Sequence, residues 1–221
     1  MSAKKYELVP EDTVTTPDGR TLFRIRALVA IAALGVSPGD LGGYIEAEKN
    51  LTQVYGNAWV YGDARVSGNA WVSGDAQVSG NAWVYGNAWV YGNARVSGNA
   101  QVSGNAWVYG DARVYGDAQV YGDARVYGDA QVYGRNHLGW FSCVGSGNGT
   151  LCWFLQKDRA IHVTRGCFSG SLEDFSAAVE KTHGDSPNGQ QYRLLIQFIE
   201  LRAAEALKDY APVDAPVEEA A

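Results

Sequence analysis

The middle of the chain alternates apolar and polar positions with a period of six. From Val54 to Gln131 the unit Val-Tyr/Ser-Gly-Asn/Asp-Ala-x repeats thirteen times without interruption. In each unit Ala and Val stand two residues apart, so a strand through Ala-x-Val-Tyr/Ser carries Ala and Val on one face. Such short strands cannot bury that face alone, but stacked coils enclose a continuous Val and Ala interior. The pattern predicts a solenoid.

A two-residue corner must follow each of these strands. Gly accepts positive φ without steric cost, while Asn or Asp tolerates the left-handed region and can hydrogen-bond its own backbone. A fourteenth unit begins at Val132 and breaks at Arg135-Asn136-His137. We therefore expect the repeat region to span residues 54–137.

This pattern resembles the hexapeptide repeat of left-handed parallel β-helices, in which three hexads form one triangular coil. The resemblance covers residues 54–137 and implies left-handed winding. Gly and the amide residue stand one position later than in the commonest acyltransferase form of that motif. Thirteen hexads would make four coils and a third, and the open ends of such a prism need caps.

The flanking segments are expected to supply those caps. Residues 1–53 are interpreted as an N-terminal β cap, with a hairpin from Thr13 to Arg26 around Pro17-Asp18-Gly19 and a lead-in at residues 39–45. Residues 138–209 are expected to form a small α+β domain, and residues 210–221 a disordered Pro/Ala/Glu-rich tail. The predicted fold class is thus mainly β: a parallel β-helix with an N-terminal cap and a C-terminal α+β domain.

The expected α+β domain contains three strands followed by two helices. Turns at residues 147–149 and 157–159 separate the strands. Ser171-Leu172-Glu173-Asp174 is typical of a capping box that opens a helix to about His183. A second helix is predicted from Gln190 to Leu207, with an apolar stripe at Leu194, Leu195, Phe198 and Leu201.

A second resemblance covers most of the chain. The lead Gly-Asp-Leu-Gly-Gly-Tyr-Ile at residues 39–45, the repeats, and Gly-Cys-Phe-Ser-Gly-Ser at residues 166–171 are similar to uncharacterised proteins of bacteriophage and prophage genomes. The resemblance implies a viral protein that works in the cytoplasm of a bacterial host. It implies no established chemistry.

The variable x position carries the candidate binding residues. If three hexads make a coil, residues eighteen apart stack about 4.8 Å from each other, and one face collects Trp71, Trp89, Trp107 and Arg125. An exposed apolar strip of this kind marks a partner surface. We favour a homo-oligomer interface, and a trimer in particular; the alternative is a platform on which planar rings or bases stack.

The C-terminal region offers a second candidate site. Arg135, Arg159 and Arg165 could hold a phosphate-bearing or otherwise anionic ligand, beside Trp140 and Trp153. His137, in the broken hexad, is expected to cap the solenoid. The candidate ligand- or partner-binding residues are therefore Trp71, Trp89, Trp107, Arg125, Arg135, His137, Trp140, Trp153, Arg159 and Arg165.

No catalytic or metal-binding pattern stands out. The thirteen hexads contain no His, and the chain has three in all, His137, His162 and His183, so neither a zinc site nor another cofactor is expected. The aspartates Asp111, Asp117, Asp123 and Asp129 fall on different faces, except for Asp111 and Asp129, and do not converge as a calcium cage requires. The chain is predicted not to be an enzyme; the alternative is an acyltransferase with His137 as general base.

Charge and composition limit the remaining partners. The net charge is −6 and the 18 Lys and Arg residues are scattered, which disfavours duplex nucleic acid. The longest apolar stretch, Ala27 to Val36, is too short to span a bilayer, and three cysteines without CxxC spacing fit a reducing cytoplasm.

These observations predict a non-catalytic oligomeric binding or scaffold protein. For a phage protein, this would mean counter-defence by sequestering a host nucleotide signal or a host protein. A structural phage component is the further alternative.

Overall fold

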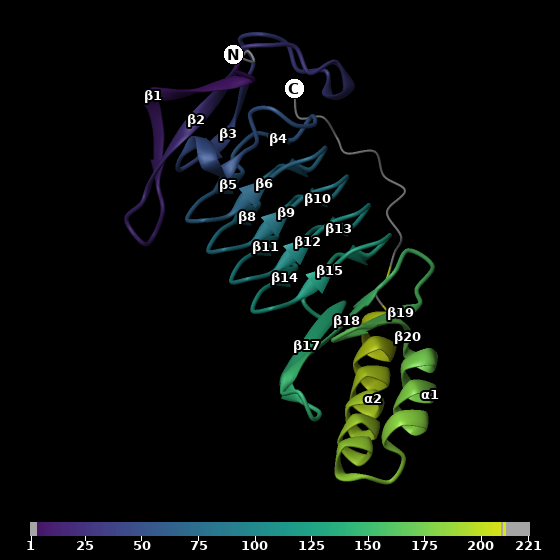
Figure 1. The fold of residues 1–221 in the computed structure, drawn as a ribbon. Helices are drawn as coiled ribbons and strands as arrows, with labels where there is room; N and C mark the ends of the chain where they lie inside the picture. The colour runs from purple at the N-terminus through teal and green to yellow at the C-terminus, as the bar shows by residue number, and fades with distance from the viewer. Residues whose placement is uncertain (1–3, 209, 211–221) are drawn as a thin grey trace.

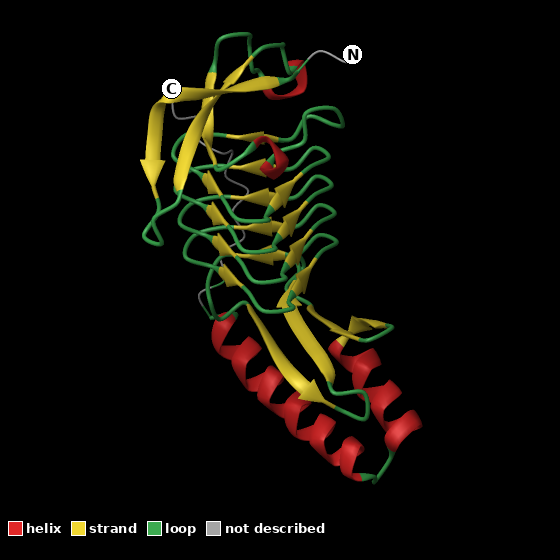
Figure 2. Ribbon diagram, turned by 60° about the vertical axis from the view of Figure 1, so that its left-hand side comes forward, coloured by secondary structure: helices red, strands yellow, loops and turns green. Residues whose placement is uncertain are grey.

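The computed structural model describes residues 4–208 and 210, and its centre is a β-solenoid (Figures 1 and 2). Each hexad contributes a two-residue strand. These are β4 (Trp59–Val60), β5 (Arg65–Val66), β6 (Trp71–Val72), β7 (Gln77–Val78), β8 (Trp83–Val84), β9 (Trp89–Val90), β10 (Arg95–Val96), β11 (Gln101–Val102), β12 (Trp107–Val108), β13 (Arg113–Val114), β14 (Gln119–Val120), β15 (Arg125–Val126) and β16 (Gln131–Val132).

The strands stack into three parallel sheets, one for each side of the coil. β5, β8, β11 and β14 form the first, β4, β7, β10, β13 and β16 the second, and β6, β9, β12 and β15 the third. Each residue pairs with the one eighteen positions later, and the backbone N–H of Trp89 donates to the carbonyl of Ala106 at 2.9 Å. Every repeat Ala and Val from Ala58 to Val132 is at most 1% exposed. The predicted parallel β-helix and its interior are confirmed.

The corner glycines are required both by backbone conformation and by close stacking. Gly86 has φ of +72°, and a Cβ placed there would lie 3.1 Å from the backbone nitrogen of Gly104. Because the corners of successive coils touch through backbone atoms, a side chain would be strained by φ and would also push the coils apart.

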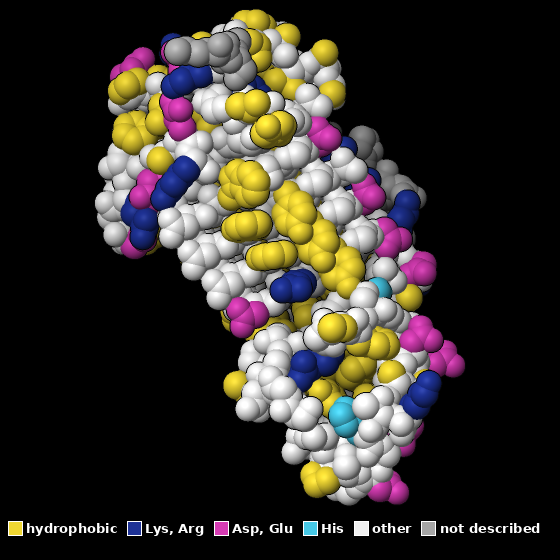
Figure 3. Space-filling view, in the orientation of Figure 1, with side chains coloured by type: hydrophobic (Ala, Val, Ile, Leu, Met, Phe, Trp, Pro, Cys, Tyr) yellow, Lys and Arg dark blue, Asp and Glu magenta, His cyan; other side chains and the backbone are white. Residues whose placement is uncertain are grey.

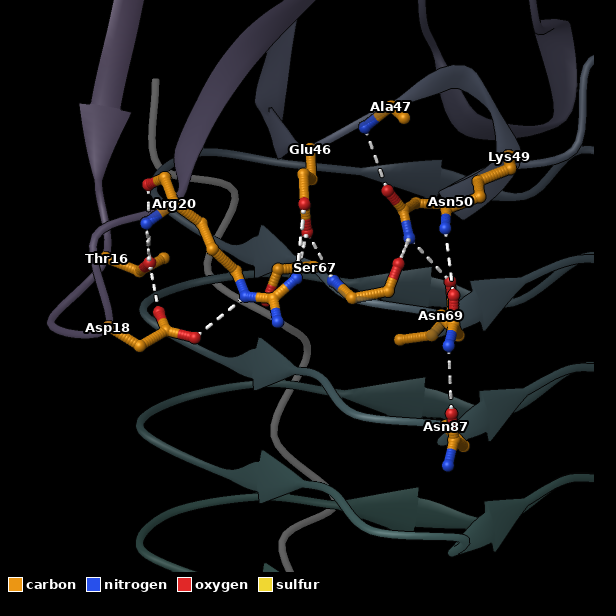
Figure 4. Close-up of polar contacts among 12 residues, drawn as sticks. Thr16, Asp18, Arg20, Glu46, Ala47, Lys49, Asn50, Ser67, Asn69 and Asn87 are labelled. Atoms are coloured by element: carbon orange, nitrogen blue, oxygen red, sulfur yellow. Dashed lines mark hydrogen bonds and ion pairs between the residues drawn. The ribbon is translucent and has the colours of Figure 1, made fainter.

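The corner amides form ladders of hydrogen bonds along the solenoid, which the sequence analysis did not predict. In one ladder Lys49 donates to Asn69 at 2.9 Å, and Asn69 donates to Asn87 at 3.2 Å (Figure 4). Asn87 then donates to Asn105, and Asn105 to Asp123, each at 3.1 Å. Because an ionised Asp accepts but cannot donate, Asp123 ends the chain of donors.

The N-terminal segment caps the first coil, as predicted. β1 (Tyr6–Thr15) and β2 (Thr21–Ala27) form the hairpin, which begins earlier than the expected Thr13, and β3 (Leu41–Ile45) joins β2 to the parallel strand β5. Two 3-10 turns, η1 (Ala32–Leu34) and η2 (Glu48–Asn50), complete the cap.

Polar side chains fix this cap to the coils beneath it. Asn50 is fully buried and its amide donates to the carbonyls of Gly68 and Ala70 at 3.1 and 2.8 Å, while Arg20 pairs with Glu46 on the outside (Figure 4). Lys5 is also buried and donates to the Ala58 carbonyl at 2.9 Å. The cap thus satisfies carbonyls that a missing coil would otherwise leave unpaired.

The C-terminal region is a four-stranded antiparallel sheet with two helices. The strands are β17 (Leu138–Val144), β18 (Gly149–Leu155), β19 (Ile161–Arg165) and β20 (Phe168–Ser171), in that order in the sheet. Three strands were predicted; β20 was missed because a four-residue Phe-Ser-Gly-Ser segment carries little strand signal.

β18 is buried on both sides and joins the two parts of the molecule. Cys152 and Phe154 belong to the same core as the solenoid interior, whereas Leu151, Trp153 and Leu155 pack with the helices. Side chains alternate along a strand, so one face of this sheet covers the last coil and the other carries the helical layer.

The two helices are α1 (Leu172–His183) and α2 (Pro187–Ala206). The predicted cap of α1 is confirmed, since Ser171 Oγ accepts from the Asp174 N–H at 3.0 Å. α2 begins three residues before the expected Gln190, after the capping residue Ser186.

The predicted apolar stripe of α2 is wrong. Its buried face carries Tyr192, Ile196, Ile199 and Ala203, whereas Leu194, Phe198 and Leu201 are 67%, 49% and 74% exposed. Of the four predicted residues, Leu195 alone packs, partly buried, against the core of the C-terminal region. Apolar residues occur on both sides of this helix, and packing against the sheet selects the other side.

Tyr210 also departs from expectation, because it was assigned to a disordered tail. The residue is 4% exposed, and its hydroxyl donates to the Gln156 carbonyl at 2.9 Å. The rest of that predicted tail, residues 211–221, lies outside the described residues.

The left-handed winding of the solenoid, which the resemblance to hexapeptide-repeat proteins implies, stays a prediction.

Candidate functional site

One side of the solenoid carries a column of stacked tryptophans. Trp71, Trp89 and Trp107 occupy equivalent positions of paired strands. The rings of Trp71 and Trp89 meet edge to face at 5.4 Å, and those of Trp89 and Trp107 are stacked at 5.2 Å with 5° between planes. The guanidinium of Arg125 lies over Trp107 at 4.9 Å and continues the column.

A second column of tyrosines runs beside the first, and sequence reasoning missed it. Tyr91, Tyr109 and Tyr127 stack with centroids 4.9 Å apart and interplanar angles of 1° and 16°. They stand two residues after Trp89, Trp107 and Arg125, at the Tyr/Ser position of the repeat. Counting this position at intervals of eighteen residues would have predicted the tyrosine column. Figure 3 shows two adjoining columns of hydrophobic side chains, one continued by a basic side chain. We call these seven residues, Trp71, Trp89, Trp107, Arg125, Tyr91, Tyr109 and Tyr127, the aromatic face.

The rings of the aromatic face mainly cover each other. Trp107 lies between Trp89 and Arg125, and Tyr109 lies between Tyr91 and Tyr127. Ring edges therefore point outward, and Trp71 and Trp89 remain 37% and 38% exposed. A flat ligand could stack on Trp107 only by displacing a neighbour, which weighs against the platform alternative. A surface of ring edges suits packing against another protein surface.

The aromatic face ends at a polar contact with the C-terminal sheet. Ser169 Oγ lies 2.5 Å from the Tyr127 hydroxyl and 3.0 Å from His162 Nε2. Burial lowers the pKa of His162, an effect that Asp129 opposes, and so favours the neutral imidazole. A Ser–His pair can activate a hydroxyl when a third group orients the imidazole, but within residues 4–208 and 210 the other ring nitrogen has no hydrogen-bond partner. The contact instead fixes β20 to the last coil.

The structure does not bring the remaining candidate residues of the C-terminal region together into one binding site. Trp153 is 1% exposed in the core and cannot reach a ligand. Arg165 donates to the Val144 carbonyl at 2.6 Å, while Arg159 lies over the Tyr210 ring at 5.8 Å. His137 is 5% exposed, and its Nδ1 accepts from the Tyr133 N–H at 3.3 Å. Its place beneath the last coil is that of a cap.

Two of the predicted residues do meet in a cleft. Arg135 and Trp140 line a hollow of about 240 Å³ between the solenoid and the C-terminal region. We call it the junction cleft; its walls also include Gln119, Tyr121, Leu138 and Arg202. Sequence reasoning missed Gln119 and Arg202, because the cleft forms only when α2 packs beside the end of the solenoid, and nothing in the local pattern of either segment indicates it.

A second hollow of about 420 Å³ lies beside α1 and the β19–β20 turn. Its lining includes Arg165, Phe168, Phe175, His183 and Tyr192.

In the described part of the chain, no group of three or more His, Cys, Asp or Glu side chains could hold a metal ion. Among the described residues, neither α1 nor α2 has the length and hydrophobicity of a membrane-spanning segment.

Comparison with known families agrees with the fold. A family model described as the YdcK β-solenoid repeat matches residues 58–74, 76–92, 88–104, 100–116 and 118–134. These matches lie within the stacked coils, and together with the observed geometry they define the chain as a repeat β-helix protein. No curated protein matches the chain.

Proposed function

We propose that this chain is a non-catalytic binding scaffold that associates with itself through the aromatic face, as a trimer. The observation that carries the proposal is the pair of aromatic columns running over successive coils. Tryptophan and tyrosine are enriched at protein interfaces and depleted on free surfaces. An unpartnered strip of this kind would be costly in water.

A second copy is the partner that fits best. The aromatic rings repeat once per coil, with centroid spacings of 4.9 to 5.4 Å. A partner that engages every rung equivalently must have the same repeat, and another copy of this solenoid has it. Three prisms meeting along one side would cover the columns and leave the C-terminal regions free for other contacts.

Counter-defence by sequestering a host nucleotide signal or a host protein is the finer form of this proposal. It is supported by the resemblance to phage proteins. Incubation with cyclic nucleotide messengers, followed by measurement of their free concentrations, and pull-down from host lysate test it; unchanged messengers and no captured protein would remove it.

The two alternatives are separately testable. An acyltransferase would use His137 as general base, but burial of this side chain does not favour contact with an external acceptor. Turnover of acyl thioesters that His137→Ala abolishes would support it. A structural phage component would be present in purified virions.

Self-association is tested by sedimentation equilibrium. The x position accepts Arg natively at Arg65, Arg95, Arg113 and Arg125, so Trp→Arg changes should preserve the coil. The variant Trp71→Arg/Trp89→Arg should be monomeric, whereas Trp83→Arg, on another side of the prism, should keep the wild-type mass. A monomeric wild type, or a double variant of unchanged mass, would refute the proposal.

A further inference from the structure

The junction cleft lies where the solenoid stops and one of its sheets has no next strand. β14 is the last strand of the sheet built from β5, β8 and β11. Its residue Gln119, and Tyr121 just beyond it, form one wall of the cleft. The other walls come from the broken hexad, from β17 and from the C-terminal half of α2.

Two backbone donors point out of this last rung. In the coil above, the N–H groups of Gln101 and Ser103 donate to the carbonyls of Ala118 and Val120 at 2.9 and 2.8 Å. The N–H groups of Gln119 and Tyr121 stand one coil further on, and among the residues that the structure describes they have no acceptor. Unpaired N–H groups at a sheet end favour an anion.

Two arginines face the same cleft from different elements. Arg135 follows β16 and Arg202 lies on α2, and both line the cleft. Neither guanidinium makes a hydrogen bond or ion pair with any residue of the described ranges. Both side chains are exposed, so their guanidinium groups are accessible to a ligand.

We propose that the junction cleft binds a phosphate group, as part of a small phosphorylated molecule. Two guanidinium groups and two backbone N–H groups supply donors from several directions, which suits a tetrahedral dianion better than a planar carboxylate. Trp140 and Tyr121, whose rings meet edge to face at 4.1 Å, border the site. They offer apolar contact to the organic part of the ligand.

The test follows amide chemical shifts of the full chain during titration with inorganic phosphate and with a nucleoside monophosphate. The N–H signals of Gln119 and Tyr121 should shift and saturate. In Arg135→Gln/Arg202→Gln affinity should fall by about tenfold or more for each arginine, since hydrogen bonds to charged groups have this magnitude. Arg95→Gln, an arginine of the solenoid surface away from the cleft, is the matched control and should bind like the wild type.

Two outcomes would overturn the proposal. One is the absence of a saturable shift at Gln119 and Tyr121 with either probe at millimolar concentration. The other is binding that the double variant keeps, because the phosphate then lies elsewhere. Far-UV circular dichroism of each variant shows that the fold is intact, and the result is independent of the oligomeric state.

Discussion

The direction of the amide ladders makes exchanges between Asn and Asp asymmetric. In the ladder that ends at Asp123, Asn105 accepts from Asn87 and donates to Asp123. Asn105→Asp would keep the acceptor, remove the donor and place a second carboxylate next to Asp123. The native chain already contains such a pair of carboxylates, because Asp111 stacks above Asp129 at an equivalent corner; Asp111 accepts from Asn93 at 2.9 Å.

The expected magnitudes follow from these contacts. A lost hydrogen bond at such a site costs about 1 kcal/mol, and two like charges about 4 Å apart in water repel by about 1 kcal/mol. Asn105→Asp should therefore lower the free energy of unfolding by roughly 1–2 kcal/mol at pH 7. Asp111→Asn should raise it by about 1 kcal/mol, because the new amide can donate to Asp129 while still accepting from Asn93.

Denaturant unfolding followed by circular dichroism measures both changes under the same conditions. The repulsion between the carboxylates should shrink in high salt, because exposed charges are screened. Equal effects of the two substitutions, or destabilisation by Asp111→Asn, would refute a directional ladder and leave the corner residues as independent solvated groups.

Three further predictions concern the corners, the N-terminal cap and the thiols. Gly86→Ala should destabilise more than Gly62→Ala in thermal unfolding, because both have positive φ but only the Gly86 Cβ would lie within 3.4 Å of the next coil. Burial lowers the pKa of Lys5 from 10.5 to about 8, so the unfolded chain binds this proton more tightly than the folded one. The free energy of unfolding should therefore rise by up to about 3 kcal/mol between these pH values, and Lys5→Met should remove that rise. Cys143 and Cys167 are exposed, whereas burial raises the pKa of Cys152 to about 12; a disulfide reagent should label two thiols in the folded protein and the third only after unfolding.

The repeat region could be predicted because its signal is local and repeated. One hexad specifies strand, corner and interior, so the eighteen-residue register that aligns Trp71, Trp89 and Trp107 follows from counting. The first helix of the C-terminal region was equally accessible, because Ser171 carries its own capping signal.

The rest depends on contacts between distant segments. α2 has apolar residues on two sides, and only its packing against the sheet shows that Ile196 is buried and Leu194 is not. Trp153 was predicted to bind a ligand because the sequence around it does not reveal that β18 is covered on both faces. The junction cleft brings Gln119 and Arg202 together across 83 positions of the chain, and no local pattern could predict that contact.

The number of hexads sets both the distance and the angle between the two ends of the molecule. Because β18 shares the solenoid core, the C-terminal sheet moves with the last coil as one piece. Inserting three hexads would shift it by about 5 Å along the axis without turning it, whereas inserting one would rotate it by about a third of a revolution. Natural variants that gain or lose whole coils would thus change the length of the protein while preserving the orientation of its ends, and single-hexad insertions would be selected against wherever that orientation matters.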